Sequence, residues 1–546
     1  MVAAVAQDGV NTPHMDWLSK YKGDLVMKAY LGSKPVAVDS LKTDPFSIPN
    51  GTDASDPRIQ ALKKQGFSAA FKAEIGLPHI NPSQLPLVIE FMEAGPKVNY
   101  NMYGKTFQIV SLEEVNKDEW VWTNASQAGT PWVFTFEVNL KLSTHPNVKD
   151  FLDRLPGPVK QEIEKNDPAN FSVQQLFFDL NNPRLSRKPT ITGVEKESHT
   201  YQLLTDYFIG AYLKQLRQDG GEMLGYAVVS DRPIQSSSFI PSAMDFEVSA
   251  YLKDGKPSED HTFYTLNYLL MSGNRVLPPP QQFPWNWMEP GATTHGAMAV
   301  RREVFGEYLK QLLSPALSHV AKIPSTSMKI ECDFPGAIYH YHESFANDPS
   351  PQHFEFFPAT PSPLILSYHY SKKHEYDADG KVCPMWYDGS YNIDYNFNSQ
   401  VIVEDNIIWL KGYMETKVYM SYGMGHINGL YQYNLERSYE LKGHNRGTVT
   451  VEMGGAGITP FDSNGISPNL IARIEGDDNV QIRCDDLDRD LTSWMNSFFG
   501  DFDLVISNVL DGNTIWVFPG GETFTYQDIY FSENQDLVTQ ITYLTI

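Results

Sequence analysis

The chain has 546 residues with 66 acidic and 43 basic side chains, and therefore a formal net charge of −23. Such a charge repels the phosphates of nucleic acids and of anionic membranes, so neither is an expected partner. Aromatic residues make up 13% of the chain, which excludes a disordered protein, and the length predicts two to four domains.

In the first half of the chain, apolar and polar side chains alternate strictly from Trp132 to Leu142. This period of two predicts an antiparallel strand with one buried side. Apolar residues at three- and four-residue spacing predict a long helix over 197–218, and Asp219-Gly220-Gly221 ends it. A strand is expected at 246–252 and a second long helix at 299–313, ending before Pro315.

In the second half, aromatic and β-branched residues predict long strands joined by tight turns over 400–433, and a further strand at 448–453. A third helix is predicted over 487–498, with the acidic run 485–490 at its N-terminus, where the helix dipole favours negative charge. A hairpin is expected at 514–526, with its turn at 519–521.

Proline and glycine residues cluster at 347–363, and this break predicts a boundary between two modules. Residues 1–346 would form an N-terminal module of sheet and helix, either as one unit or as two sub-domains. Residues 347–546 would form a C-terminal, sheet-rich module that contains the helix at 487–498.

The cysteines are far apart in the sequence and form no Cys-x-x-Cys pair; they are Cys332, Cys383 and Cys484. The spacing predicts neither a disulfide framework nor a zinc site, and a reducing compartment is the simpler interpretation. The N-terminus has no secretory signal pattern, and no run approaches the roughly 18–20 apolar residues of a membrane span. We therefore expect a soluble, cytoplasmic protein with no transmembrane segment.

The candidate for chemistry is the segment Tyr339-His340-Tyr341-His342-Glu343. On a strand His340 and His342 would share one face, as metal-binding His-x-His pairs do. No third ligand stands at a diagnostic offset, and the chain has no nucleophile elbow or phosphate-loop motif. No metal, cofactor or catalytic residue is therefore predicted. In the alternative interpretation His340, His342 and Glu343 supply acid–base groups.

A proline-rich segment at 278–290 concentrates large amphipathic rings that could contact an apolar ligand or a partner, or cap the end of a sheet. Tyr212 and Tyr308 lie on the apolar stripes of the two long predicted helices. The candidate ligand-binding residues are therefore Phe283, Trp285, Trp287, Tyr212 and Tyr308.

Taken together, the strands, the helices and the segment Phe283-Pro-Trp285-Asn-Trp287, followed by Gly296-Ala-Met-Ala-Val300 and a helix, resemble the tubular lipid-binding superfamily. The nearest members are the accessory proteins of clostridial neurotoxin gene clusters. The resemblance covers residues 80–320 and about the last hundred. It implies an α+β fold in which long curved antiparallel sheets wrap around long amphipathic helices and leave an apolar channel. Because no catalytic residues are shared across this superfamily, the resemblance implies none in this chain.

The leading functional hypothesis is a non-enzymatic binding protein for a hydrophobic or lipid-like small molecule, or a component of a protein assembly. The alternative is a cofactor-free biosynthetic isomerase or cyclase that folds its substrate in an apolar pocket. A third possibility is a sugar-binding or structural β-protein, because exposed Trp and Tyr rings also stack on carbohydrate.

Overall fold

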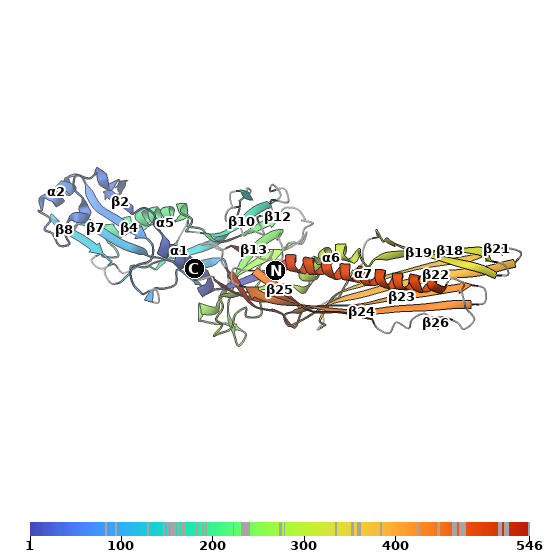
Figure 1. Cartoon of the computed structure of the whole chain (residues 1–546). Coiled ribbons are helices and arrows are strands. Elements are labelled where there is room, and N and C mark those ends of the chain that lie inside the picture. Colours follow the sequence, from blue (N-terminus) through green and yellow to red (C-terminus); the bar gives the residue numbers. More distant parts are fainter. Residues whose placement is uncertain are drawn as a thin grey trace.

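The structure is a computed structural model. It describes residues 1–81, 84–92, 95–127, 130–145, 148–149, 152, 160, 164, 168, 171–180, 184–187, 191, 194–221, 223–230, 241–271, 276–277, 279–333, 336–350, 354–357, 362–382, 385–422, 425–444, 448–460, 467–468, 477–510, 516–517 and 524–543. Within these ranges the molecule is an elongated α+β protein (Figure 1), and the paired strands of its named sheets are antiparallel.

An N-terminal sheet lies at one end of the molecule (Figure 1). Its strand order is β3 (Lys34–Val36), β2 (Val26–Leu31), β4 (Phe67–Ile75), β7 (Gly104–Asn116) and β8 (Glu119–Ser126). Helix α2 (Pro57–Lys64) buries Ile59 and Leu62 in one small core with Phe67 and Trp122 of this sheet. The opposite face of the sheet contributes Phe71 and Phe107 to the main core.

The helix predicted over 197–218 is confirmed, as α4 (His199–Leu203), a π-turn (Leu204–Phe208) and α5 (Ile209–Gln218). Phe208, in the π-turn, packs on the main-core face of the N-terminal sheet, with ring centroids 5.3 Å from Phe71 and 5.7 Å from Phe107. Helix α1 (Gln7–Lys20) buries His14 and Leu18 in the same continuous core.

A second sheet has the order β27 (Trp516–Val517), β12 (Met223–Ser230), β10 (Phe171–Phe178), β9 (Phe134–His145), β6 (Lys97–Met102) and β5 (Ile89–Phe91), and β11 (Arg184–Arg187) also pairs with β9. Strand β9 confirms the alternation predicted over 132–142. The predicted hairpin at 514–526 is wrong, because β27 pairs with β12 instead of with the following strand. Its expected turn at 519–521 lies outside the described residues.

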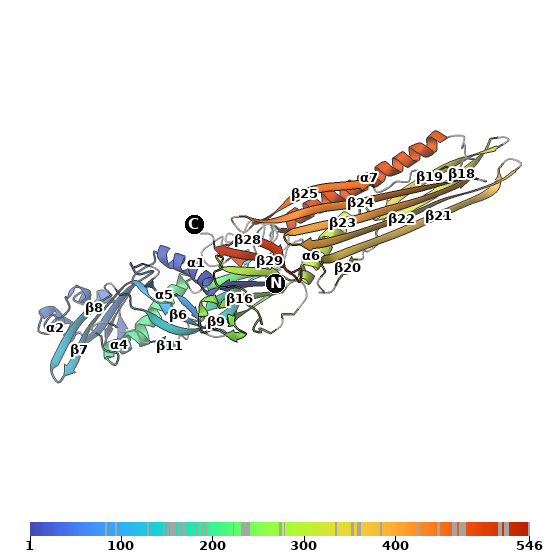
Figure 2. The ribbon, with the colours of Figure 1, turned by 90° about the horizontal axis from the view of Figure 1, so that it is seen from below.

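A central sheet brings together strands that are far apart in the sequence (Figure 2). Its order is β13 (Ala243–Ser249), β16 (Thr265–Met271), β1 (Val2–Ala6), β17 (Gly296–Val300), β29 (Leu537–Tyr543) and β28 (Phe524–Phe531). Strand β13 overlaps the strand predicted at 246–252. A short hairpin of β14 (Leu252–Lys253) and β15 (Lys256–Pro257) follows β13.

A C-terminal sheet of long strands extends from the central sheet (Figures 1 and 2). Its order is β20 (Phe354–Phe356), β21 (Leu364–Val382), β22 (Met385–Glu404), β23 (Ile407–Tyr422), β24 (Gly425–His444) and β25 (Thr448–Pro460), and β26 (Ser467–Pro468) pairs with β24. These strands confirm the predictions at 400–433 and 448–453. Asp405 closes the tight β22–β23 turn with φ 51°, a left-handed conformation that aspartate tolerates better than most residues.

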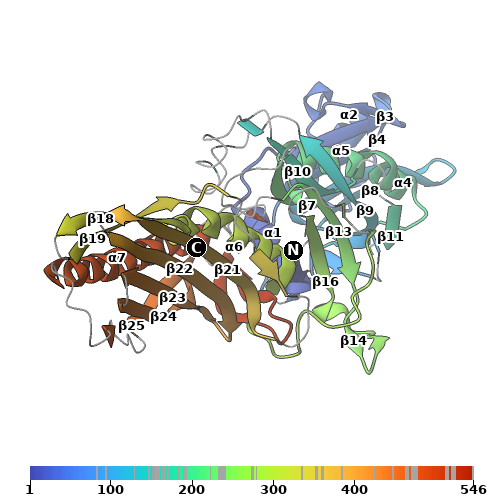
Figure 3. The same cartoon turned by 90° about the vertical axis from the view of Figure 1, so that its right-hand side faces the viewer.

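One face of the C-terminal sheet is covered by two helices and a β-hairpin, which together are called the cover (Figure 3). The cover consists of α6 (Arg302–Leu317), α7 (Asp477–Leu510) and the hairpin of β18 (Lys322–Asp333) and β19 (Gly336–Asn347). Over the described residues the helices lie against sheet faces, and a sheet wrapped around a helix is not shown. Gly443 of β24 permits a close approach to the central sheet, because a Cβ there would lie 2.0 Å from the carbonyl oxygen of Tyr526 in β28.

Three predicted helix boundaries are wrong, and one of them is the end of the helix predicted over 487–498, which continues to Leu510. Helix α6 continues through Pro315 to Leu317, although the proline cannot donate a backbone hydrogen bond to the preceding turn. Helix α7 begins ten residues before 487, at Asp477, so the acidic run at 485–490 lies inside it. There Arg489 offsets part of that charge by pairing with Asp486 at 2.7 Å.

The cysteine interpretation also needs correction, because Cys332 is disulfide-bonded. A disulfide removes the basis on which a reducing compartment was expected. The module boundary at 346/347 remains a prediction; it falls at the end of β19. No helix in the described part of the chain is both long and apolar enough to cross a membrane.

Candidate functional site

The candidate site is the inner face of the C-terminal sheet, the side that carries the cover. Alternation along each strand buries every second side chain, and the buried set is strongly aromatic. It comprises Leu366, Tyr368 and Tyr370 of β21; Tyr391, Ile393, Tyr395, Phe397, Ser399, Val401 and Val403 of β22; Ile408, Leu410, Met414, Thr416, Val418 and Met420 of β23; and Tyr431, Tyr433, Leu435, Tyr439 and Leu441 of β24.

Helix α7 presents an apolar stripe to this inner face, at spacings of four, four, three and four residues: Leu487, Leu491, Met495, Phe498 and Phe502. The Phe498 ring lies 5.8 Å from that of Phe397, and the Phe502 ring lies 5.1 Å from that of Tyr439. The helix therefore packs on at least two strands, β22 and β24, and buries aromatic surface between them.

The hairpin β18–β19 covers the inner face farther along the strands. Tyr341 of β19 donates a hydrogen bond to the Ser421 carbonyl oxygen of β23 at 3.0 Å. Thr326 of β18 donates to the Tyr391 carbonyl oxygen of β22 at 2.7 Å. Because the cover crosses from β22 to β23, it closes the interior over several strands.

Buried hydroxyl groups on this face generally have partners in the cover. Tyr395 donates to the Val320 carbonyl oxygen at 2.5 Å, and Tyr391 donates to Glu343 Oε2 at 2.9 Å. Tyr439 donates to Asp503 Oδ1 of α7, and its burial together with this bond raises its pKa well above the usual value. The interior thus follows the rule that buried polar groups are hydrogen-bonded.

Thr416 and Tyr433 depart from that rule. Their side chains are 0% and 4% exposed, yet neither hydroxyl has a hydrogen-bond partner among the residues that the structure describes. Thr416 pairs with Tyr431 and Met414 pairs with Tyr433, so the two hydroxyl-bearing residues occupy diagonal positions on neighbouring strands. Each unmade hydrogen bond in such an interior costs about 1–3 kcal/mol.

The predicted ligand-binding residues lie at separate places. Tyr212, on α5, is buried in the N-terminal half and donates to the Tyr103 carbonyl oxygen at 3.1 Å; burial raises its pKa well above the usual value. Tyr308 is buried on α6. The remaining three residues form a surface cluster, in which the Phe283 ring lies 4.9 Å from that of Trp285 and 5.0 Å from that of Trp287. Their ligand-binding role remains a prediction.

Two side-chain amides hold this aromatic segment, one on the end of β13 and the other on β14. Gln282 donates to the Val248 carbonyl oxygen and accepts from the Ala250 N–H. Asn286 accepts from the Leu252 N–H at 2.7 Å and donates to the carbonyl oxygen of the same residue at 2.9 Å. Trp285, which is 50% exposed, is thereby presented to solvent from an anchored loop.

Replacing Asn286 with alanine should release this loop, since two hydrogen bonds to one backbone residue are lost. We expect the free energy of unfolding to fall by about 1–2 kcal/mol and cleavage of the loop by protease to accelerate. Chemical denaturation and limited proteolysis measure both effects. Gln281→Ala, at an exposed neighbouring side chain, is the control, and equal behaviour of the two variants would contradict the anchoring role.

The residues of the enzyme hypothesis lie on β19. His340 and His342 are on one face of the strand and Glu343 is on the other. His340 Nε2 lies 3.4 Å from Glu331 Oε2, and Glu343 accepts the hydrogen bond from Tyr391. Among the described residues, no group of three His, Cys, Asp or Glu side chains is placed to hold a metal ion.

Sequence reasoning missed Thr416 and Tyr433. Alternation in 400–433 assigns both residues to the buried face, but the absence of a partner depends on what the cover presents to them. A threonine within a run of apolar and aromatic inward positions was the available signal.

No protein-family model matches the chain, and no curated protein sequence matches it. The crystal structure of P47 of Clostridium botulinum E1 is similar over 100% of this chain and 98% of its own, with 11% identity and a TM-score of 0.39. The crystal structure of a lipopolysaccharide binding protein is similar over the same shares, with 8% identity and a TM-score of 0.29. At these scores neither likeness assigns a fold or a function to this chain, and the superfamily resemblance remains a prediction.

Proposed function

We propose that the protein is a non-enzymatic binding protein for an elongated hydrophobic molecule with one polar group. The ligand would lie between the inner face of the C-terminal sheet and its cover. The polar group would accept or donate hydrogen bonds at Thr416 and Tyr433, and the apolar part would follow the aromatic side chains along the strands.

The unpartnered hydroxyls of Thr416 and Tyr433 are the observation that carries this proposal. Other hydroxyls of the inner face, such as those of Tyr395 and Tyr439, are satisfied by the protein itself. A ligand that bonds to both unpartnered groups would recover the free energy that their burial costs. The aromatic surroundings favour an apolar body for the same ligand.

The first test is extraction of the purified protein, with native mass spectrometry and chromatography of the extract. We expect a co-purified apolar molecule, or saturable binding of the fluorescent fatty acid cis-parinaric acid to the emptied protein. A protein that carries no such molecule and does not bind the probe would refute the proposal.

The second test is the double variant Thr416→Val with Tyr433→Phe, which removes the two hydroxyls and keeps the side-chain shapes. Loss of two hydrogen bonds to the ligand should weaken binding of the probe about tenfold or more. The empty variant should be as stable as the original protein or more so, because no unpaired hydroxyl is buried. Tyr419→Phe, on the solvent-facing side of β23, is the matched control. Unchanged probe binding by the double variant would contradict the assigned site.

A further inference from the structure

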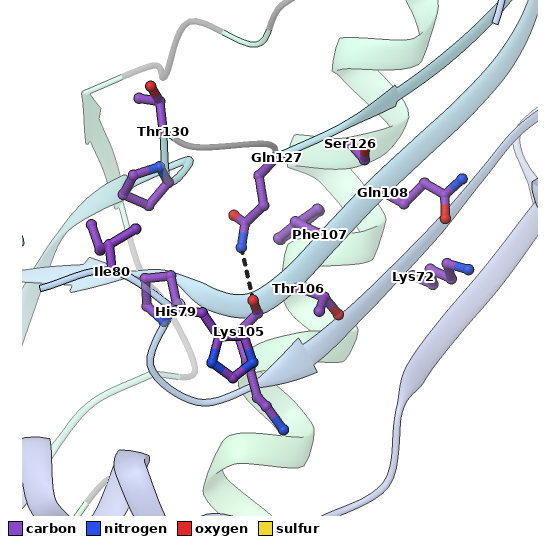
Figure 4. Close-up of a pocket in the computed structure, with 12 residues that line it drawn as sticks. Lys72, His79, Ile80, Lys105, Thr106, Phe107, Gln108, Ser126, Gln127 and Thr130 are labelled. Carbon is purple, nitrogen blue, oxygen red and sulfur yellow. Dashed lines mark hydrogen bonds between the residues drawn. The ribbon is translucent and has the colours of Figure 1, made fainter.

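A pocket of about 450 Å³ lies beside strands β4, β7 and β8, at the opposite end of the molecule from the C-terminal sheet (Figure 1). Figure 4 shows the residues that line it. Its floor is a row of side chains in register across three strands: Lys72 of β4 pairs with Gln108 of β7, which pairs with Ser126 of β8. Residues 78–80 and 130–131 form its walls. The volume falls in the range of pockets that bind small molecules.

The polar side chains that line the pocket are basic or uncharged. Lys72, Lys105 and His79 are basic, and Thr106, Ser126 and Thr130 add hydroxyl groups, while none of the described residues that line the pocket is Asp or Glu. In a chain with a net charge of −23, a concave site lined by cations concentrates positive potential. Such a lining favours a ligand that is both anionic and rich in hydroxyl groups.

The two lysines are held differently. Lys105 Nζ pairs with Glu74 at 2.5 Å, so part of its charge is already compensated. Lys72 Nζ lies 4.7 Å from the centre of the Phe46 ring and makes no ion pair with a described residue. Lys72 is therefore the cation best placed to meet an anionic ligand, because no carboxylate has to be displaced.

The wall of the pocket is fixed and partly apolar. Gln127 donates to the carbonyl oxygens of Gly104 at 2.8 Å and Lys105 at 3.1 Å and accepts from the Trp132 N–H, which ties the end of β8 to β7 and to the segment before β9. Pro78, Ile80 and Pro131 supply apolar surface beside the polar floor. A sugar ring offers both kinds of face, with hydroxyls at its edge and C–H groups across its plane.

We propose that this pocket binds a soluble acidic sugar, a monosaccharide that carries a phosphate or a carboxylate group. Lys72 binds the anionic group, the hydroxyls of Thr106, Ser126 and Thr130 bind those of the sugar, and the apolar wall contacts the ring. The site is independent of the hydrophobic ligand proposed above, so either proposal can fail alone.

Calorimetric titration of the full chain with glucose 6-phosphate, galacturonate, glucose and inorganic phosphate tests the proposal. At least one acidic sugar should bind saturably at millimolar or lower concentration, about tenfold or more tightly than glucose and than phosphate, and added salt should weaken that binding. Binding of glucose as tight as that of both acids, binding of phosphate alone, or no saturable binding of either acid would overturn it.

Substitutions in the pocket test whether the acidic sugar binds there. Lys72→Gln should lower the affinity for the acidic sugar about tenfold, because a charge-assisted contact is lost. Ser126→Phe should block the pocket while keeping both lysines. Lys34→Gln, on β3 of the same sheet, should change nothing. Thermal unfolding establishes that each variant is folded; acid-sugar binding that survives both pocket variants would place the ligand elsewhere and refute the site.

Discussion

Phe498→Ala should destabilise the C-terminal half of the molecule by about 3–5 kcal/mol, as expected for a fully buried phenylalanine whose removal leaves a cavity. The Phe498 side chain is buried on α7 and contacts Phe397 on the sheet, and Phe499 and Phe502 lie beside it on the helix. Urea denaturation followed by circular dichroism and tryptophan fluorescence measures the loss.

Leu504→Ala on the same helix is the matched control. Leu504 is 63% exposed, so truncating it should change the free energy of unfolding by about 0.5 kcal/mol or less. If Phe498→Ala were no more harmful than Leu504→Ala, helix α7 would not pack on the sheet as described, and the interior proposed for the ligand would be refuted as well.

Acidification should destabilise the N-terminal half through His14. This side chain is 2% exposed, and burial lowers its pKa from 6.5 to about 4. Between these values the unfolded chain binds a proton that the folded chain does not. The contribution of His14 to the free energy of unfolding is therefore complete above pH 6.5 and is lost as the pH falls toward 4. We expect a loss of about 2 kcal/mol between pH 8 and pH 5 from this residue alone.

Denaturation of the His14→Phe variant at several pH values isolates the effect. The rings of Trp17, Tyr100 and Phe178 lie about 6 Å from the His14 ring, with centroid distances of 6.0, 6.1 and 6.0 Å, so a phenylalanine suits the site. The variant should lose less stability on acidification than the original chain. His199→Gln, at an exposed histidine, should keep the original slope; equal slopes in all three proteins would contradict the prediction.

Local patterns in the sequence predicted local structure well. The alternation at 132–142 and the stripe at 197–218 each gave an element of the correct type, because periodicity reports which side of a strand or helix is buried. The beginning of α7 was missed because the polar residues from Asp477 onward do not extend the apolar stripe to its first turns. The Pro519-Gly520-Gly521 signal predicted a hairpin, but the preceding strand pairs with β12, nearly 300 residues earlier in the chain.

The candidate sites were harder to predict than the elements. Tyr212 is a candidate because of its place on an apolar helical stripe, and Trp285 because of its large amphipathic ring. Neither property reports what surrounds the side chain in the fold. Thr416 is distinguished only by a hydroxyl that the cover leaves unpaired. The basic pocket depends on the register that aligns Lys72, Gln108 and Ser126 across three strands, and one sequence does not determine that register.

The position of β29 beside β17 has a consequence for biosynthesis. On one side β17 pairs with β1, which is translated before it, whereas its other neighbour is residues 537–543, which are translated more than 200 residues later. Until the ribosome has released those residues, β17 has a bare hydrogen-bonding edge that could join another nascent chain. Premature termination before residue 524 should therefore give aggregated product rather than a smaller folded protein.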